Sequence, residues 1–100
     1  MLTARQGITK YKKVLCINLL VFWKPGCAKC PAAKELGKEF EAEGVGVNYL
    51  NISEPEGLSE AAMHGIMGTP SLVVVDDSGS EVASWKSEVP EKDDVAKALQ

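Results

Sequence analysis

The sequence predicts an α/β fold in which a central mixed four-stranded β-sheet is flanked by helices on both faces. Three observations support it: an almost continuously apolar run over residues 14–23, an amphipathic helical pattern directly after it, and turn-forming residues between later apolar segments. A continuous apolar run of this kind is typical of a strand buried on both faces. With 45% hydrophobic and 25% charged residues, the 100-residue chain is expected to form one domain, with its core at about residues 14–99.

The first two predicted strands enclose a helix. After the strand at residues 14–23, apolar positions recur every three or four residues, which predicts an amphipathic helix. The helix begins at or just before Pro31, because proline suits a first turn, and Gly44 suits the position after its end. Residues 45–50 form the second strand. The strand–helix–strand order predicts a parallel pair joined by a right-handed crossover.

A short second helix is expected next. Ser53 and Glu56 match a capping box, and apolar residues continue to a helix end near Gly65. Gly57 weakens this prediction, because glycine lowers helix stability. His64 is the only histidine, and a position at the helix C-terminus or simple exposure explains it.

The rest of the chain predicts a hairpin and a final helix. Residues 71–75 are rich in β-branched side chains and form a third strand, 76–79 carry turn residues, and 81–86 return as a fourth strand. A last helix is expected from about residue 90 to residue 99. Residues 1–9 show no periodicity, so we expect a loose terminus there.

Charge and hydropathy argue against two classes of partner. The formal net charge is −3, whereas nucleic-acid binding needs a clustered excess of lysine and arginine. The basic cluster of Lys10, Lys12 and Lys13 is interpreted as a solvated lead-in to the first strand. The apolar run after it is shorter than the roughly 20 residues that a bilayer requires, and no cleavage site follows. We therefore expect no nucleic acid, no membrane and a cytoplasmic location in which thiols stay reduced.

Cys27 and Cys30 form the chemical motif of the chain. They lie at the predicted helix start, where unpaired backbone N–H groups and the helix dipole favour a thiolate at Cys27. Such placement lowers a thiol pKa from about 8.5 into the range of roughly 3.5–7.5. Cys30, about one turn inward, would keep a higher pKa and resolve a mixed disulfide. Lys24 and Lys29 add weak support for the anion.

Two other interpretations of this cysteine pair stay open. The pair can be half of a zinc site, but structural zinc needs two further ligands, and Cys16 and His64 are the remaining cysteine and histidine. Cys16 lies roughly 20 Å back along an extended strand, which disfavours zinc. We interpret Cys16 as a small buried apolar residue of that strand. An inert structural pair is the other alternative.

The sequence resembles the thioredoxin superfamily over about residues 14–99. The segment VFWKPGCAKC, residues 21–30, resembles the first core strand of that family running into its redox loop. Residues 49–52 are similar to its next strand, and GIMGTP followed by SLVVV, residues 65–75, is similar to the stretch around the family's cis-proline. The resemblance implies a thioredoxin-like fold.

The resemblance also implies roles for individual residues. Thr69–Pro70 is expected to be a cis peptide bond beside Cys27, with the Thr69 backbone offered to an extended substrate segment. A trans proline that opens an edge strand is the alternative. Trp23 resembles the family's aromatic residue beneath the redox loop, with core packing as its alternative. Trp85 is expected in the core or on the hairpin surface rather than at the site.

Several positions differ from the family pattern. Gly26 stands where the family has a tryptophan before the first cysteine, and Ala28 and Lys29 replace its Gly-Pro and tune the thiolate. The family's buried Asp falls at Val21 and its Lys partner at Tyr49, which leaves the base for the resolving thiol unassigned. The chain is also expected to lack the family's first strand and helix. Its size is therefore closer to that of glutaredoxins, although the Gly-Gly that helps hold glutathione in them is absent.

Three functional hypotheses follow. The first is a monomeric thiol–disulfide oxidoreductase that reduces protein disulfides, needs no metal or cofactor besides its own disulfide, and is recycled by a partner reductase. Its expected site comprises the cysteines Cys27 and Cys30, the thiolate-tuning Ala28 and Lys29, and the substrate contacts Trp23, Gly26, Thr69 and Pro70. The second is a non-catalytic adaptor or redox-sensing binding domain. The third is a small metal-binding domain with ligands from another chain.

Overall fold

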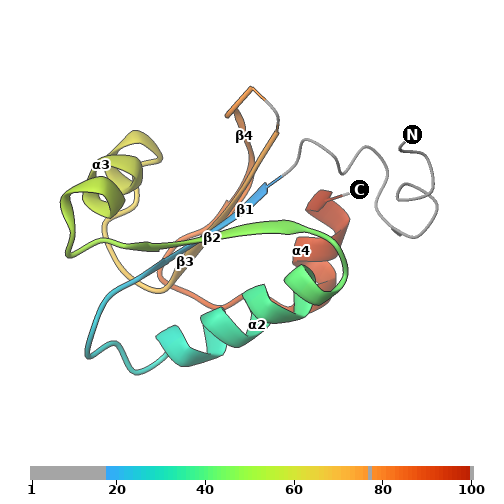
Figure 1. Cartoon of the computed structure of the whole chain (residues 1–100), viewed down its shortest axis with the longest axis horizontal. Helices are drawn as coiled ribbons and strands as arrows, with labels where there is room; N and C mark the ends of the chain where they lie inside the picture. The colour runs from blue at the N-terminus through green and yellow to red at the C-terminus, as the bar shows by residue number, and fades with distance from the viewer. Residues whose placement is uncertain (1–17, 77, 100) are drawn as a thin grey trace.

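Strand β1 (Asn18–Trp23) lies inside a four-stranded sheet of order β2-β1-β3-β4 (Figure 1). It pairs in parallel with β2 and antiparallel with β3, which pairs antiparallel with β4. The computed structural model describes residues 18–76 and 78–99. The further elements are α2 (Cys30–Ala42), β2 (Gly46–Asn51), α3 (Pro55–Met63), β3 (Ser71–Val75), β4 (Glu81–Trp85) and α4 (Lys92–Leu99). The predicted mixed four-stranded α/β architecture is confirmed.

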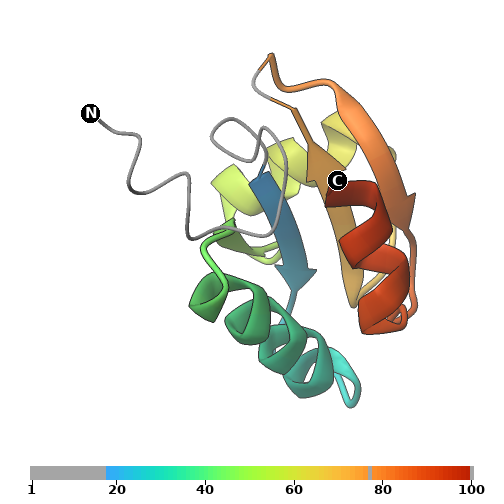
Figure 2. The ribbon, with the colours of Figure 1, turned by 90° about the vertical axis from the view of Figure 1, so that its right-hand side faces the viewer.

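Alternate residues of β1 are buried on opposite faces of the sheet. Leu19 and Val21 belong to a core that includes residues of α2 and α4, whereas Leu20 and Phe22 belong to a second core that includes Ala61 of α3. Figure 2 shows α2 and α4 on one side of the sheet and α3 on the other. Burial on both faces explains why the sequence of β1 is continuously apolar from Leu19 to Trp23. Each fully buried side chain of this size stabilises the fold by about 1.5–3 kcal/mol.

Helix α2 ends at a left-handed glycine, as its sequence predicts. Gly44 has a φ of +98°, and its N–H donates to the carbonyl oxygen of Glu41 at 3.0 Å. The N–H of Val45 donates to the carbonyl oxygen of Phe40, also at 3.0 Å, and both side chains are buried in the same core. This pair of bonds satisfies carbonyls that the helix end leaves free. The second strand consequently begins at Gly46 rather than at Val45.

The predicted capping box at the start of α3 is wrong. The helix begins at Pro55 with Glu54 as its N-cap, and the cap makes no side-chain hydrogen bond. Ser53 instead lies in a turn, where its N–H donates to Oδ1 of Asn51 at 2.8 Å. Pro55 occupies the start of the helix and has no N–H to satisfy, which removes part of the need for a cap. The asparagine turn therefore sets where this helix starts.

Gly57 has a packing role in α3. It is buried, and a Cβ at this position would collide with the backbone of Asn51 at the end of β2. Glycine therefore lets the first turn of α3 approach the strand closely. Gly57 weakens the helix through its low helix propensity, but the close packing of α3 on the end of β2 requires a residue without a Cβ.

The turn between β3 and β4 is organised by Asp76. Its Oδ1 accepts hydrogen bonds from the backbone N–H groups of Ser78 and Ser80, both at 3.0 Å, and from the Ser78 hydroxyl at 2.7 Å. These bonds, above all that from the Ser78 hydroxyl, hold the pKa of the Asp76 carboxyl below its usual range. Gly79 has a φ of +87°. The predicted hairpin is thereby confirmed.

The remaining boundaries differ slightly from the predictions. Strand β4 ends at Trp85, one residue before the expected Lys86, and α4 begins at Lys92 rather than near Pro90. Among the described residues, no helix is long and apolar enough to cross a membrane. The predictions for residues 1–17, including the loose terminus, the lysine cluster and Cys16, lie outside the described residues.

Candidate active site

The register of the sheet brings the redox loop and the segment before β3 to the same end. Phe22 faces Ser71 in the antiparallel pair of β1 and β3. Pro70 therefore comes next to Trp23, the last residue of β1, and the loop of residues 24–29 leaves the sheet from this point. Two segments that lie forty residues apart in the sequence converge here.

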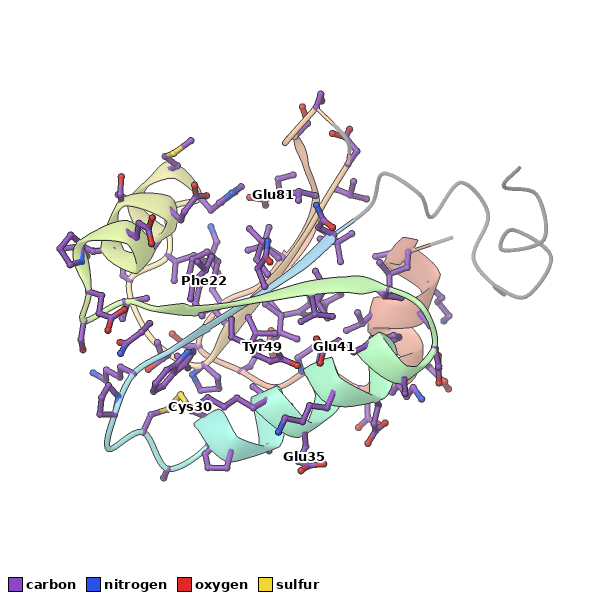
Figure 3. All side chains as sticks on the ribbon, in the orientation of Figure 1. Phe22, Cys30, Glu35, Glu41, Tyr49 and Glu81 are labelled. Carbon is purple, nitrogen blue, oxygen red and sulfur yellow. A yellow bond between two sulfur atoms is a disulfide. The ribbon has the colours of Figure 1, made fainter. Side chains whose placement is uncertain are left out.

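Cys27 and Cys30 form a disulfide whose Cα atoms lie 5.4 Å apart. Cys30 is the first residue of α2 and is 3% exposed, whereas Cys27 in the preceding turn is only partly buried. Figure 3 shows the disulfide at the start of this helix. Cys27 is the more exposed of the two, as expected if Cys27 is the attacking cysteine and Cys30 the resolving one.

At the start of α2 the N–H of Cys30 donates to the carbonyl oxygen of Cys27 at 3.4 Å and Pro31 has no N–H, so it is mainly the helix dipole that acts on an anion here. Lys29 is the N-cap and makes no side-chain cap bond, and the first turn contains no acidic residue. Gly26 is exposed and has a φ of +79°, a left-handed conformation that glycine adopts without strain and that turns the chain into the helix. Once the disulfide is reduced, the positive end of the helix would stabilise a thiolate here.

Lys34 is a site residue that sequence reasoning missed. Its Nζ lies 3.4 Å from the centroid of the partly buried Trp23 ring, in a cation–π contact. Lys34 lies one helical turn beyond Cys30, and this spacing could have indicated it. The contact holds Trp23 between the end of β1 and the start of α2, so the aromatic residue expected beneath the redox loop lies at the loop's base.

The positions of the family's buried acid and base carry Val21 and Tyr49, which face each other across β1 and β2. Val21 is fully buried. The Tyr49 hydroxyl donates to Oε1 of Glu41 at 3.0 Å, and in Figure 3 the two side chains meet over α2. Glu41 lies about three helical turns beyond Cys30, so this hydroxyl is remote from the resolving thiol.

Burial raises the pKa of Tyr49 to about 12, with smaller contributions from its hydrogen bond to Glu41 and from the charges of Glu41 and Glu35. Tyr49 therefore stays protonated at neutral pH. Neither Val21 nor Tyr49 can accept the proton of the Cys30 thiol.

The peptide bond between Thr69 and Pro70 is cis, the isomer that the resemblance implied. Pro70 and Ser71 are buried. The Ser71 hydroxyl donates to the carbonyl oxygen of Gly68 at 2.8 Å and accepts from the backbone N–H of Ser87 at 2.9 Å. These two bonds fix the segment before β3. By contrast, Oγ1 of Thr69 is buried without a hydrogen-bond partner among the described residues.

Met67 is a second residue that sequence reasoning did not single out. It is 95% exposed, whereas the preceding Ile66 is 6% exposed and packs in the core on the α3 side of the sheet. Because Ile66 is anchored in the core, the neighbouring Met67 side chain stays exposed to solvent and is available for contact with a partner. Its position between Gly65 and Gly68, just before Thr69–Pro70, is the sequence signal that could have indicated it.

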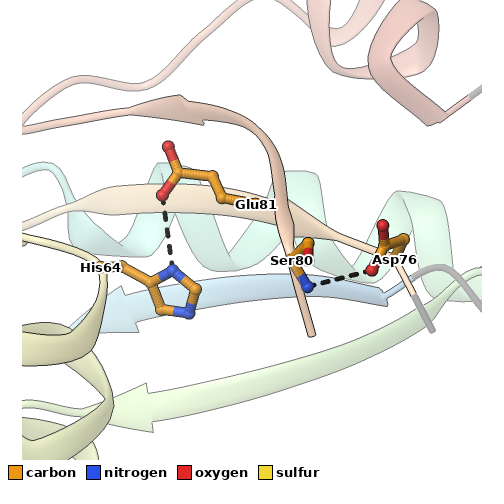
Figure 4. A network of polar contacts seen from close by, with 4 residues as sticks. All are labelled: His64, Asp76, Ser80 and Glu81. Carbon is orange, nitrogen blue, oxygen red and sulfur yellow. Dashed lines mark hydrogen bonds and ion pairs between the residues drawn. The ribbon is translucent and has the colours of Figure 1, made fainter. Parts of the chain in front are cut away.

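His64 has a structural position on the α3 side of the sheet. It is the C-cap of α3, and its Nδ1 lies 3.4 Å from Oε1 of Glu81 in β4. Figure 4 shows this contact beside the bond between Asp76 and Ser80. The His64 ring also lies 6.3 Å from that of Phe22. The side chain is only 10% exposed, so the helix-end interpretation is confirmed and simple exposure is wrong.

Two further expectations concern Trp85 and metal binding. Trp85 packs against the core that includes residues of α2 and α4, as expected for a residue outside the site. Within residues 18–76 and 78–99, no group of three or more His, Cys, Asp or Glu side chains could hold a metal ion.

Two solved structures share this fold. A point mutant of thioredoxin from Halobacterium salinarum superposes with a TM-score of 0.67 over 83% of this chain and 71% of that chain, at 24% identity. The reduced thioredoxin pre-protein of Schistosoma mansoni gives a TM-score of 0.69 over 96% of this chain and 85% of that chain, at 16% identity.

The sequence comparisons identify the family. The chain is 39% identical over 61 residues to a probable thioredoxin of Archaeoglobus fulgidus, covering 60% of this chain and 67% of that protein. It is 34% identical over 64 residues to a thioredoxin of Methanocaldococcus jannaschii, covering 61% of this chain and 73% of that protein. Residues 17–100 match the family model described as a thioredoxin domain. The chain therefore belongs to the thioredoxin family.

Proposed function

We propose that this chain is a thiol–disulfide oxidoreductase that reduces protein disulfides through Cys27 and Cys30. The observation that carries the proposal is the disulfide at the start of α2, with Cys27 partly exposed and Cys30 buried. Only the more exposed sulfur can meet a disulfide on another protein. The buried sulfur is within bonding reach of the first and can release the product.

The cycle begins with the reduced protein. The Cys27 thiolate attacks one sulfur of a substrate disulfide, which forms a mixed disulfide and releases one substrate thiolate. Cys30 then loses its proton to solvent and attacks Sγ of Cys27, which forms the intramolecular disulfide and releases the second substrate thiolate. A partner reductase returns two electrons and completes the cycle. No cofactor besides the cysteine pair takes part, and a reducing, cytoplasmic setting suits this direction of electron flow.

The substrate contacts lie around Cys27 on both converging segments. Gly26 leaves open space beside Cys27, since nothing lies within 4 Å of where its Cβ would be. Thr69 and Pro70 offer backbone to an extended substrate segment at the end of the sheet. Met67 adds the exposed apolar side chain that the family's tryptophan would otherwise supply. Trp23 supports this surface from beneath, and Ala28 and Lys29 tune the thiolate.

Reduction of insulin by dithiothreitol tests the proposed activity. Wild-type protein is expected to accelerate the reaction catalytically, and Cys27→Ser is expected to abolish the acceleration. Cys16→Ser is the matched control and is expected to retain wild-type turnover. Wild-type protein without turnover would support a non-catalytic adaptor and contradict the proposal, as would an active Cys27→Ser variant.

Met67→Asp tests the docking surface. Loss of one apolar contact and introduction of a charge are expected to raise KM for insulin about five- to tenfold, while the rate with a small aromatic disulfide stays unchanged. Met63→Asp, at a 74% exposed position of α3, is the control and is expected to leave both rates unchanged. Equal effects of the two variants, or loss of the small-disulfide rate in Met67→Asp, would contradict a docking role.

A further inference from the structure

Lys34 differs from the neighbouring lysines in being partly buried. Lys24, Lys29 and Lys38 are exposed, as is usual for a lysine side chain. The Nζ of Lys34 instead lies 3.4 Å from the centroid of the Trp23 ring. None of the residues three and four positions away from Lys34 on α2 is acidic, and Lys38 at the next turn carries the same charge. The ring, rather than an ion pair on the helix, therefore holds this ammonium group.

Trp23 gives the contact a fixed base. It is the last residue of β1 and pairs with Asn51 of β2, and its carbonyl oxygen accepts a hydrogen bond from the N–H of Ile52 at 2.9 Å. The face of a tryptophan ring attracts a cation, more strongly where water is partly excluded, and both Trp23 and Lys34 are partly buried. The contact therefore ties the second turn of α2 to the end of β1, on either side of the redox loop.

The backbone holds the first turn of α2 only weakly. The N–H of Cys30 donates to the carbonyl oxygen of Cys27 at 3.4 Å, and that of Ala33 donates to that of Lys29 at 3.3 Å. Both bonds are longer than the usual distance of about 2.9–3.0 Å. Pro31 has no N–H, and the N-cap makes no side-chain bond. The disulfide adds a covalent tie in the oxidised protein, so after reduction this turn depends more on the cation–π contact.

We propose that Lys34, acting through Trp23, is a positioning residue that keeps the Cys30 thiol within reach of Cys27 while the disulfide is open. The proposal rests on the proposed function, since it concerns the same exchange reaction. Closure of the disulfide passes two electrons and two protons from the dithiol to an oxidant such as oxidised dithiothreitol and forms the bond between the two Sγ atoms. Less freedom is lost on closure when the two thiols are already held together. The contact therefore favours the disulfide form and speeds the resolving step.

The test compares Lys34→Met, which keeps an unbranched stem and removes the charge, with Lys34→Arg, which keeps a cation. Lys38→Met is the matched control, since it removes the same charge from an exposed position one turn further along α2. In Lys34→Met the equilibrium with dithiothreitol is expected to shift about three- to tenfold toward the protein dithiol. Lys34→Arg and Lys38→Met are expected to lie within about twofold of the wild-type equilibrium.

The direction of the shift separates positioning from a direct effect of charge. If Lys34 acted only as a positive charge near a thiolate, its removal would destabilise the dithiol form and move the equilibrium toward the disulfide. A shift in that direction would overturn the proposal. So would an unchanged equilibrium, an equal shift in Lys38→Met, or a Lys34→Arg variant that behaves like Lys34→Met.

A double-mutant cycle with Trp23→Leu tests whether Lys34 acts through the ring. In the Trp23→Leu background, Lys34→Met is expected to shift the equilibrium less than twofold, and a full shift there would overturn the proposal. Urea unfolding of both redox forms is expected to show a larger loss of stability for Lys34→Met in the oxidised form. An equal loss in both forms would mean a purely structural role. These measurements use no protein substrate, so failure of insulin turnover would overturn the proposed function and leave this test readable.

Discussion

Gly57→Ala is expected to destabilise the protein, although helix propensity alone predicts the opposite. Gly57 lies in the first turn of α3, buried against the end of β2. A Cβ at this position would lie 2.5 Å from the carbonyl carbon of Asn51 and 3.0 Å from its nitrogen. An ordinary carbon–carbon contact is about 3.5 Å, so the helix and the strand end would have to separate by about 1 Å.

The size of the effect follows from two opposing contributions. Overpacking of this kind costs about 1–3 kcal/mol. The upper part of that range applies to Gly57, because the obstacle is the backbone of Asn51 and cannot rotate away. Alanine recovers up to about 1 kcal/mol through its higher helix propensity. The Gly57→Ala variant is therefore expected to be about 2 kcal/mol less stable than wild type.

Urea unfolding of the oxidised protein, followed by tryptophan fluorescence, measures the difference. Gly37→Ala is the matched control, because Gly37 is also buried in a helix but its Cβ would lie 3.0 Å from the Cε1 and Oη atoms of Tyr49, which can turn aside. This variant is expected to stay within about 1 kcal/mol of wild type. A Gly57→Ala variant as stable as wild type, or a Gly37→Ala variant that loses as much, would refute the reasoning.

Two further predictions concern single hydroxyl groups. Tyr49 is expected to titrate at about pH 12, and because its pKa is raised on folding, its contribution to stability is present below pH 10 and is lost as the pH rises toward 12. Absorbance at 295 nm, with Tyr49→Phe as the blank, measures the pKa of Tyr49. Because burial is the largest cause of the shift, Glu41→Gln should lower this pKa only in part. A Tyr49 pKa near 10 in the wild-type protein would contradict the burial argument. Ser71→Ala leaves the Ser87 N–H without its partner and should cost about 2 kcal/mol in urea unfolding, whereas a loss below about 0.5 kcal/mol would show that the hydroxyl is dispensable.

Much of the fold could be predicted because its signals are local and periodic. The continuous apolar run at residues 19–23 indicates a two-sided strand, and the structure buries its alternate residues in two different cores. The helical period after Cys30 and the glycine at position 44 indicate where α2 lies and ends. The partial exposure of Cys27 and the burial of Cys30 follow from their places before and inside that helix.

The sequence-based predictions failed where contacts between different segments determine the structure. The motif at Ser53 looks like a cap, but the Asn51 side chain binds the Ser53 backbone and the helix starts later. Gly57 looks unfavourable until the approach of Asn51 is known. The exposure of Met67 and the unpaired hydroxyl of Thr69 depend on how the segment before β3 packs. The glycines at positions 65 and 68 mark this segment in the sequence, but they do not show which of its side chains are buried.

The division of labour between Cys27 and Cys30 is the central claim, and trapping of the mixed disulfide tests it most directly. Cys30→Ser, incubated with a disulfide-containing protein, is expected to accumulate one covalent adduct per chain. Peptide mapping by mass spectrometry should place that adduct on Cys27. Cys27→Ser should form little adduct under the same conditions, because its remaining site cysteine is 3% exposed. The account would be contradicted if Cys27→Ser formed an adduct at Cys30 as fast as Cys30→Ser forms one at Cys27.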